Sequence, residues 1–160
     1  MDKVLVVNDS KFERKVFKYV LKQLDKEVSE SKEFEVFEKI DEIKPNVVII
    51  NLIMKDIRGD DLIQRLKKRY PKIKYILSSC SQINFRDYRD KKVDAVLQTP
   101  VEEKELAEIF EFLERQQEIG EEKIETKKDN EFSFCSYCGK DFTEEVVGEI
   151  LFCPYCGQKI

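Results

Sequence analysis

The stretch Val47-Val48-Ile49-Ile50-Asn51 decides the fold, because four consecutive apolar residues give way at once to a polar side chain. The same change occurs where the apolar run 4–7 is followed by Asn8 and Asp9. Continuous apolar runs of four residues are typical of central strands in a parallel sheet whose two faces are both covered by helices. The two stretches therefore predict two neighbouring central strands, each ending in polar residues.

Three further strands and the helices between them complete the pattern. Shorter apolar runs at 75–77 and 95–97 predict two strands, and Val28 predicts one at an edge of the sheet. Apolar residues recur at helical spacing in four segments: Phe12, Val16, Val20, Leu21 and Leu24; Phe34, Phe37, Ile40 and Ile43; Leu62, Ile63 and Leu66; and Leu106, Ile109, Phe110 and Leu113. Residues 81–92 have the poorest periodicity, so the helix expected there is the weakest element. The alternation predicts an α/β fold, a doubly wound five-stranded parallel sheet over residues 1–119.

The composition changes after residue 119. Residues 120–130 are almost devoid of apolar side chains, which predicts a polar linker or an extension of the last helix. Residues 131–160 contain four of the five cysteines of the chain. They predict a second, small domain.

Composition excludes several classes of function. The chain has no histidine, which excludes Ser-His and Cys-His nucleophilic pairs and histidine metal ligands. Its formal net charge of −4 argues against nucleic acid as a partner, because no general attraction to phosphate results. No apolar run is long enough to span a bilayer and the N-terminus lacks a secretory pattern, so we expect a cytoplasmic protein without a membrane partner.

The four C-terminal cysteines form two CxxCG repeats, Cys135 with Cys138 and Cys153 with Cys156, separated by 14 residues. Two facing CxxC turns make a tetrahedral site of four thiolates, and a disulfide pairing is disfavoured in a cytosolic chain. About 30 residues bury too little apolar surface to fold alone, and bound Zn²⁺ contributes an apparent ~10–16 kcal/mol. Four protein ligands leave no position open for substrate, so we expect a structural site in a metal-stapled β ribbon.

This segment resembles a zinc ribbon. Its CxxCG repeats are also similar to those of short rubredoxin-like domains, which bind iron through the same four-sulfur ligand set. Residues 131–160 carry five acidic and two basic side chains, which disfavours DNA binding. Protein contact through the aromatic residues is the better hypothesis, and these are Tyr137, Phe142, Phe152 and Tyr155.

In a doubly wound sheet, functional residues gather where the strands end. Here those residues are Asn8, Asp9, Asn51, Ser79 and Thr99. The segments around them run in order as residues 4–10, 51–59, 71–79 and 94–100, and together they resemble the successive signatures of the response-regulator receiver domain over about the first 115 residues.

The resemblance implies a phosphoryl acceptor at position 51, where receivers have an aspartate and this chain has Asn51. A neutral amide is a weak nucleophile, so we expect no aspartyl-phosphate chemistry. Asn8 replaces the first acid of the family's acidic pair, which leaves Asp9 as the only acid and predicts weak Mg²⁺ binding or none. Thr99 stands where the family has a lysine.

The remaining receiver positions are also altered in part. The hydroxyl after the fourth strand is kept as Ser79, and Val96 stands at the family's aromatic switch position. We expect Asn8, Asn51, Ser79 and Thr99 to satisfy one another by hydrogen bonds. A plainer role for Asp9 is as a carboxylate at a helix N-terminus.

For Cys80 and for the basic residues of 65–74, a structural role is favoured over a functional one. Cys80 follows Ser79, and we expect a thiol packed in the core without a redox role. The basic residues of 65–74 could dock an acidic partner, but a solvated face of the third helix is the favoured interpretation.

The sequence thus predicts a phosphorylation-incompetent, receiver-like interaction or scaffold module in signal transduction, with a zinc ribbon as a second docking surface and no enzyme activity. Its partners are signalling proteins that the sequence does not identify. The resemblance also allows a homodimer through the surface of the fourth helix, fifth strand and last helix. Three alternatives stay open: a redox or electron-transfer protein with a rubredoxin-like iron site, a zinc-ribbon transcription regulator, and a working switch in which Asn51 deamidates or another residue accepts phosphate.

Overall fold

The computed structural model describes residues 2–125, with side chains described for residues 2–116. The predicted metal ligands Cys135, Cys138, Cys153 and Cys156 lie outside the described residues, as does the predicted ribbon domain. The chain divides into two compact units, Met1–Glu118 and Ile119–Ile160.

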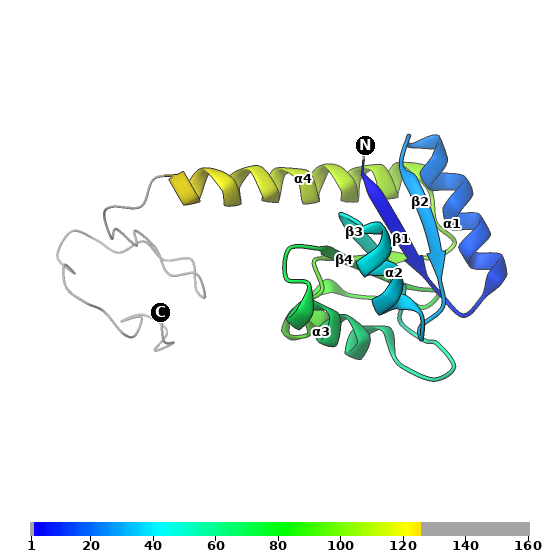
Figure 1. Cartoon of the computed structure of the whole chain (residues 1–160). Helices are drawn as coiled ribbons and strands as arrows, with labels where there is room; N and C mark the ends of the chain where they lie inside the picture. Colours follow the sequence, from blue (N-terminus) through cyan, green and yellow to red (C-terminus); the bar gives the residue numbers. More distant parts are fainter. Residues whose placement is uncertain (1, 126–160) are drawn as a thin grey trace. The chain divides into compact units, whose positions relative to one another are not determined.

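A five-stranded parallel sheet forms the centre of the first unit (Figure 1). Its strands are β1 (Lys3–Val7), β2 (Glu27–Ser31), β3 (Val47–Asn51), β4 (Lys74–Ser79) and β5 (Ala95–Gln98). They lie in the order β2-β1-β3-β4-β5, with every neighbouring pair parallel. The predicted doubly wound sheet is confirmed, including the edge strand around Val28.

Helices cover the two faces of the sheet as separate layers, each with its own apolar cluster. On one face, α1 (Lys11–Gln23) and α4 (Glu103–Glu125) pack on the sheet through residues such as Phe17, Leu21 and Phe110. On the other face, α2 (Val36–Ile43) and α3 (Gly59–Arg69) pack through residues such as Ile40 and Leu66. The apolar runs of β1 and β3 are fully buried because both layers cover them.

Three of the predicted details are wrong. The segment 81–92 holds a 3₁₀ helix, η1 (Phe85–Lys91), with no fully buried residue, so it lacks the apolar stripe that would hold an α-helix on the sheet. Phe12 is 77% exposed, because the sheet-facing positions of α1 belong to Phe17 and Leu21. Phe34 precedes α2 and is 74% exposed, and Val36 takes the core position in its place.

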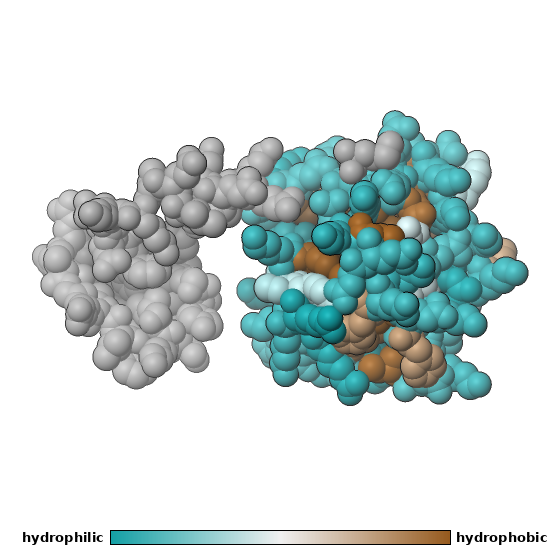
Figure 2. Space-filling view, in the orientation of Figure 1, coloured by the Kyte–Doolittle hydropathy of each residue, from teal (hydrophilic) through white to brown (hydrophobic). Residues whose placement is uncertain are grey.

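Residues 120–125, which the sequence assigns to a linker or a helix extension, belong to α4. Within the described residues, none of the helices combines the length and apolarity that crossing a bilayer requires. Figure 2 shows that the drawn face of the first unit is mainly hydrophilic, with separate hydrophobic patches.

Candidate functional site

The register of the sheet brings the predicted polar residues to one edge. Val7 pairs with Ile50 and Asn51 pairs with Ser78, so the residues that end β1, β3 and β4 lie side by side. This is the edge at which the carboxyl ends of parallel strands form a ligand site.

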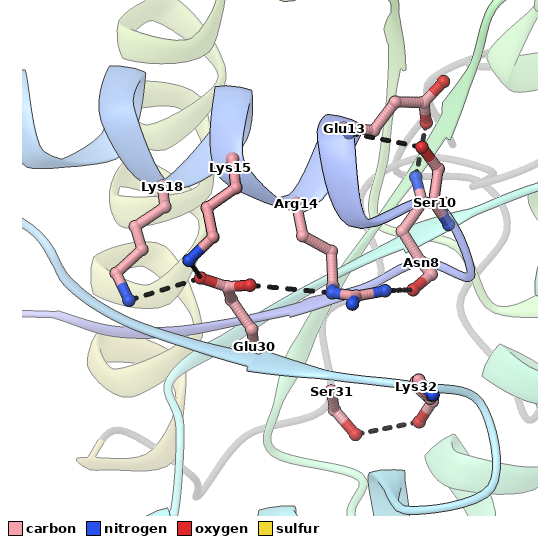
Figure 3. Close-up of polar contacts among 9 residues, drawn as sticks. All are labelled: Asn8, Ser10, Glu13, Arg14, Lys15, Lys18, Glu30, Ser31 and Lys32. Carbon is pink, nitrogen blue, oxygen red and sulfur yellow. Dashed lines mark hydrogen bonds and ion pairs between the residues drawn. The ribbon is translucent and has the colours of Figure 1, made fainter.

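Asn8 is 1% exposed and all of its polar groups are bonded (Figure 3). Its amide nitrogen Nδ2 donates to the Glu13 carboxylate, and its Oδ1 accepts from the Ser10 backbone N–H at 2.9 Å. Its backbone carbonyl accepts from the buried guanidinium of Arg14. The amide of Asn8 therefore acts as a donor to a carboxylate, which an ionised aspartate could not do.

Asn51 ends β3 and uses its amide in the same way. Its Nδ2 donates to the Ile53 carbonyl oxygen at 2.7 Å, which closes a turn directly after the strand. The first residue of α3, Gly59, passes so close that a Cβ there would overlap the Asn51 carbonyl oxygen. Both asparagines at the family's aspartate positions are thus donors to oxygen atoms.

Asp9 ties β1 to the loop after β3. Its Oδ2 accepts the Lys55 backbone N–H at 3.0 Å, while Ser10 provides the N-cap of α1 through its Oγ and the Glu13 backbone N–H. Asp9 therefore orders a loop, and Ser10, the next residue, is the N-cap of α1.

Ser79 and Thr99 meet where β4 and β5 end. Ser79 is 3% exposed, its Oγ accepts the Ser81 backbone N–H at 3.2 Å, and its carbonyl accepts the Thr99 N–H at 2.8 Å. The Thr99–Pro100 peptide bond is cis. Next to Asn51 in the sheet, the Ser78 Oγ is the single buried side-chain polar atom in the described part of the chain without a hydrogen-bond partner.

The expectation that the four neutral side chains satisfy one another is wrong. No side-chain hydrogen bond in the described region joins two of the residues Asn8, Asn51, Ser79 and Thr99. Each bonded side chain instead uses a group close to it along the chain. The four residues lie at one edge but form no network.

Glu13 is the residue at this edge whose side-chain contact the sequence did not reveal. The capping-box pattern at Ser10 explains why the Glu13 backbone N–H donates to the Ser10 hydroxyl. It gives no reason for the Glu13 carboxylate to turn toward Asn8. The signal available in the sequence was the position of an acid on the first turn of α1, five residues after Asn8.

A cluster of cations around Glu30 extends from Arg14 along α1 (Figure 3). The Glu30 carboxylate lies 3.2 Å from Lys18, 3.5 Å from Lys15 and 3.6 Å from Arg14. Burial alone would raise the pKa of Glu30, but the hydrogen bond from Lys18 and the charges of Lys15 and Lys18 outweigh burial and lower the pKa. The cluster fixes α1 to the edge strand β2.

Cys80 is exposed, so the prediction of a thiol packed in the core is wrong. Its neighbours include Phe12, Pro100 and Val101, with which it lines a cavity of about 260 Å³ between α1 and the loop that joins β5 to α4. β4 ends at Ser79, and the chain turns outward one residue later.

The basic stretch of 65–74 is partly neutralised inside the domain. Lys67 pairs with Asp94 at 2.9 Å and Arg69 pairs with Asp41 at 2.9 Å. Over residues 2–116, no group of three or more Cys, Asp or Glu side chains is arranged to hold a metal ion.

Comparison with known proteins agrees with the geometry. Residues 4–111 match the response regulator receiver domain family. The chemotaxis proteins CheY of Listeria monocytogenes and Listeria innocua are each 32% identical over 81 residues, which are 49% of this chain and 68% of theirs.

Solved receiver structures share the fold. A CheY-like receiver domain of Methanospirillum hungatei superposes with a TM-score of 0.65 at 23% identity, covering 74% of this chain and 98% of that one. A receiver domain of Clostridium thermocellum gives 0.66 at 19% identity, covering 74% and 98%. Because the family match spans residues 4–111 and the fold agrees with solved receiver structures, the chain belongs to the response-regulator receiver family of two-component signalling.

Proposed function

We propose that this receiver domain does not accept a phosphoryl group and acts as a protein-docking module in a signalling pathway. The observation that carries the proposal is the use of both asparagine amides as donors. Asn8 donates to a carboxylate and Asn51 donates to a carbonyl, and these are roles that the ionised aspartates of an active receiver could not fill.

The chemistry of phosphoryl transfer supports the same view. Acyl-phosphate formation requires a carboxylate nucleophile, and the side chain of Asn51 offers only a neutral amide. A cation must stabilise the charge that develops on the phosphoryl oxygens, and Thr99 brings none. Mg²⁺ prefers anionic oxygen, and Asp9 already accepts a hydrogen bond from Lys55. The proposal therefore includes weak Mg²⁺ binding and no catalytic role for this chain.

Intact mass spectrometry after incubation with acetyl phosphate and Mg²⁺ tests this proposal. We expect no added phosphate, while a receiver whose third strand ends in aspartate, treated in parallel, gains the mass of one. Peptide mapping of any modified form follows, because deamidation of Asn51 would create the missing acid. A phosphate mapped to the strand-end residues between positions 8 and 99 would overturn the proposal.

For the C-terminal segment, we propose a structural metal held by Cys135, Cys138, Cys153 and Cys156. The donor set fits Zn²⁺, since four thiolates in two CxxC pairs satisfy its tetrahedral preference, and iron accepts the same set. When bound, the metal supplies folding free energy to this short segment.

Metal analysis of protein purified without added metal separates the candidates. We expect one zinc per chain and a colourless protein, which supports a structural zinc site. A red protein with stoichiometric iron would replace this part of the proposal by a redox role.

A further inference from the structure

The two helices that cover one face of the sheet carry opposite charge. Both α1 and α4 pack on the apolar cluster that contains Phe17, Leu106 and Phe110, so they lie in the same layer. Because they share a layer, their solvent-facing sides belong to the same face of the domain, which we call the α1/α4 face.

The α1 half of this face is basic and aromatic. The helix carries five basic side chains and one acidic side chain. Glu30 neutralises one of the three cations that surround it, and within residues 2–116 the exposed Lys11 and Lys22 form no ion pair. Phe12 and Tyr19 lie seven residues apart on the same side of the helix and are 77% and 69% exposed. Two exposed aromatic rings beside a basic stripe are typical of a surface that contacts protein.

The α4 half is acidic. Residues 103–116 carry five acidic and two basic side chains. Glu108, Glu111 and Glu114 are exposed, and Glu114 reaches the domain's own Lys26 at 3.6 Å. This ion pair shows that Glu114 reaches a lysine in the turn between α1 and β2.

We propose that the α1/α4 face binds a second copy of the same domain, with α1 of each copy on α4 of the other. A two-fold interface must be self-complementary, because the same patch supplies both sides. A patch with one basic half and one acidic half meets that condition when the two-fold axis passes between the halves. The basic half of each copy then faces the acidic half of the other. The alternative two-fold arrangement would set α1 on α1, and basic side chains would face basic side chains.

The aromatic residues supply the apolar part of this contact. Phe12 and Val16 of α1 border a cavity of about 260 Å³ that Pro100 and Val101, in the loop between β5 and α4, line from the other side. The α1/α4 face therefore offers an apolar hollow beside the first half of α1 in addition to its charged side chains, and protein interfaces combine apolar and charged contacts in this way. This surface differs from the one built on the fourth helix, which in this chain is the 3₁₀ helix η1.

Charge reversal on one half at a time tests the proposal in the full chain. Lys11→Glu with Lys22→Glu makes the α1 variant, and Glu108→Lys with Glu111→Lys makes the α4 variant. Lys68→Glu with Lys72→Glu, at exposed positions in and just after α3 on the opposite layer, is the control. Sedimentation velocity at about 0.1 mM protein measures the dimer fraction, which suits a Kd in the micromolar range.

We expect the wild type and the control to form dimers that weaken as salt is added, because exposed charges are screened. Each variant alone should dimerise at least about tenfold more weakly, because both of its contacts join like charges. An equimolar mixture of the two variants should dimerise more strongly than either one. In the mixed dimer the reversed α1 faces the reversed α4 and the unchanged α1 faces the unchanged α4, so both contacts join opposite charges. A monomeric wild type, an α1 variant as dimeric as the control, or a mixture no more dimeric than the separate variants would overturn the proposal. The outcome does not depend on phosphorylation, so this inference and the proposed function fail separately.

Discussion

At Asn8 and Asn51, the side chain carries an NH₂ group where an aspartate would carry a second oxygen. That position therefore donates a hydrogen bond, whereas a carboxylate oxygen would accept one. Each amide nitrogen faces an oxygen that can only accept, a carboxylate for Asn8 and a carbonyl for Asn51. The identity of these residues could be read from the sequence, and so could their meeting at one edge. Their actual partners could not, because which neighbour a short side chain reaches depends on the path of the loops.

Asn8→Asp is predicted to destabilise the domain by about 1–3 kcal/mol at neutral pH, because a buried carboxylate would then face the Glu13 carboxylate. Urea denaturation measures the free energy of unfolding. The double variant Asn8→Asp with Glu13→Gln should recover most of the loss, since the amide introduced at position 13 can donate to the new carboxylate. An Asn8→Asp variant as stable as the wild type at pH 7 would contradict the described contact.

Glu30 gives a prediction for pH dependence. Its pKa is lower in the folded domain than its ordinary value of 4.5, so its contribution to stability is present above that value and is lost as pH falls through the folded pKa. Glu30→Gln should cost roughly 1 kcal/mol at pH 7 and progressively less as pH falls below 4.5 and through the lowered pKa of the folded state. Denaturation series at several pH values measure this. An equal loss at pH 7 and pH 3 would show that the ion pairs of Glu30 contribute nothing.

At the scale of elements, the strands follow from the sequence more closely than the helices do. The continuous apolar runs 4–7 and 47–50 predict central strands, because both faces of such a strand must be covered. Both runs are buried in the centre of the sheet. The stripe predicted on α1 is confirmed for Val16, Val20, Leu21 and Leu24, which lie in or against the buried cluster. It wrongly included the exposed Phe12 and missed the buried Phe17, because both are large and apolar and only tertiary contact distinguishes them. The weak periodicity of 81–92 correctly marked the element that became η1.

The connection from β3 to α3 is tightly packed, because Gly59 passes against the end of the strand. Gly59→Ala is predicted to cost about 1–3 kcal/mol, since the added methyl group would overlap the Asn51 backbone. Thermal unfolding followed by circular dichroism measures the loss. Asp61→Ala, on the same helix and partly exposed, is the matched control and should change stability by less. Equal losses of stability in the two variants would contradict the close approach of Gly59 to the Asn51 backbone.

At the scale of the whole molecule, the order of apolar runs was enough to predict the sheet, because parallel connections allow few topologies. Charge was harder to interpret. The net charge of −4 conceals the separation between basic α1 and acidic α4, which becomes visible only when the fold places the two helices in one layer.

Cysteine reactivity tests the organisation of the whole chain. Cys80 is exposed, and the other four of the five cysteines are the proposed metal ligands. A thiol reagent such as DTNB should therefore modify Cys80 alone in the metal-loaded protein and all five cysteines after a strong chelator is added. Full reactivity before chelation would contradict the proposed metal site.

The central claim is that the cleft at the strand ends no longer responds to a phosphoryl group. Beryllofluoride with Mg²⁺ mimics that group, and amide NMR shifts of residues 8–9, 51–56, 79–81 and 99 report on the cleft directly. We expect spectra that do not change up to millimolar beryllofluoride. Saturable shifts at Asn51 and its neighbours would contradict the claim.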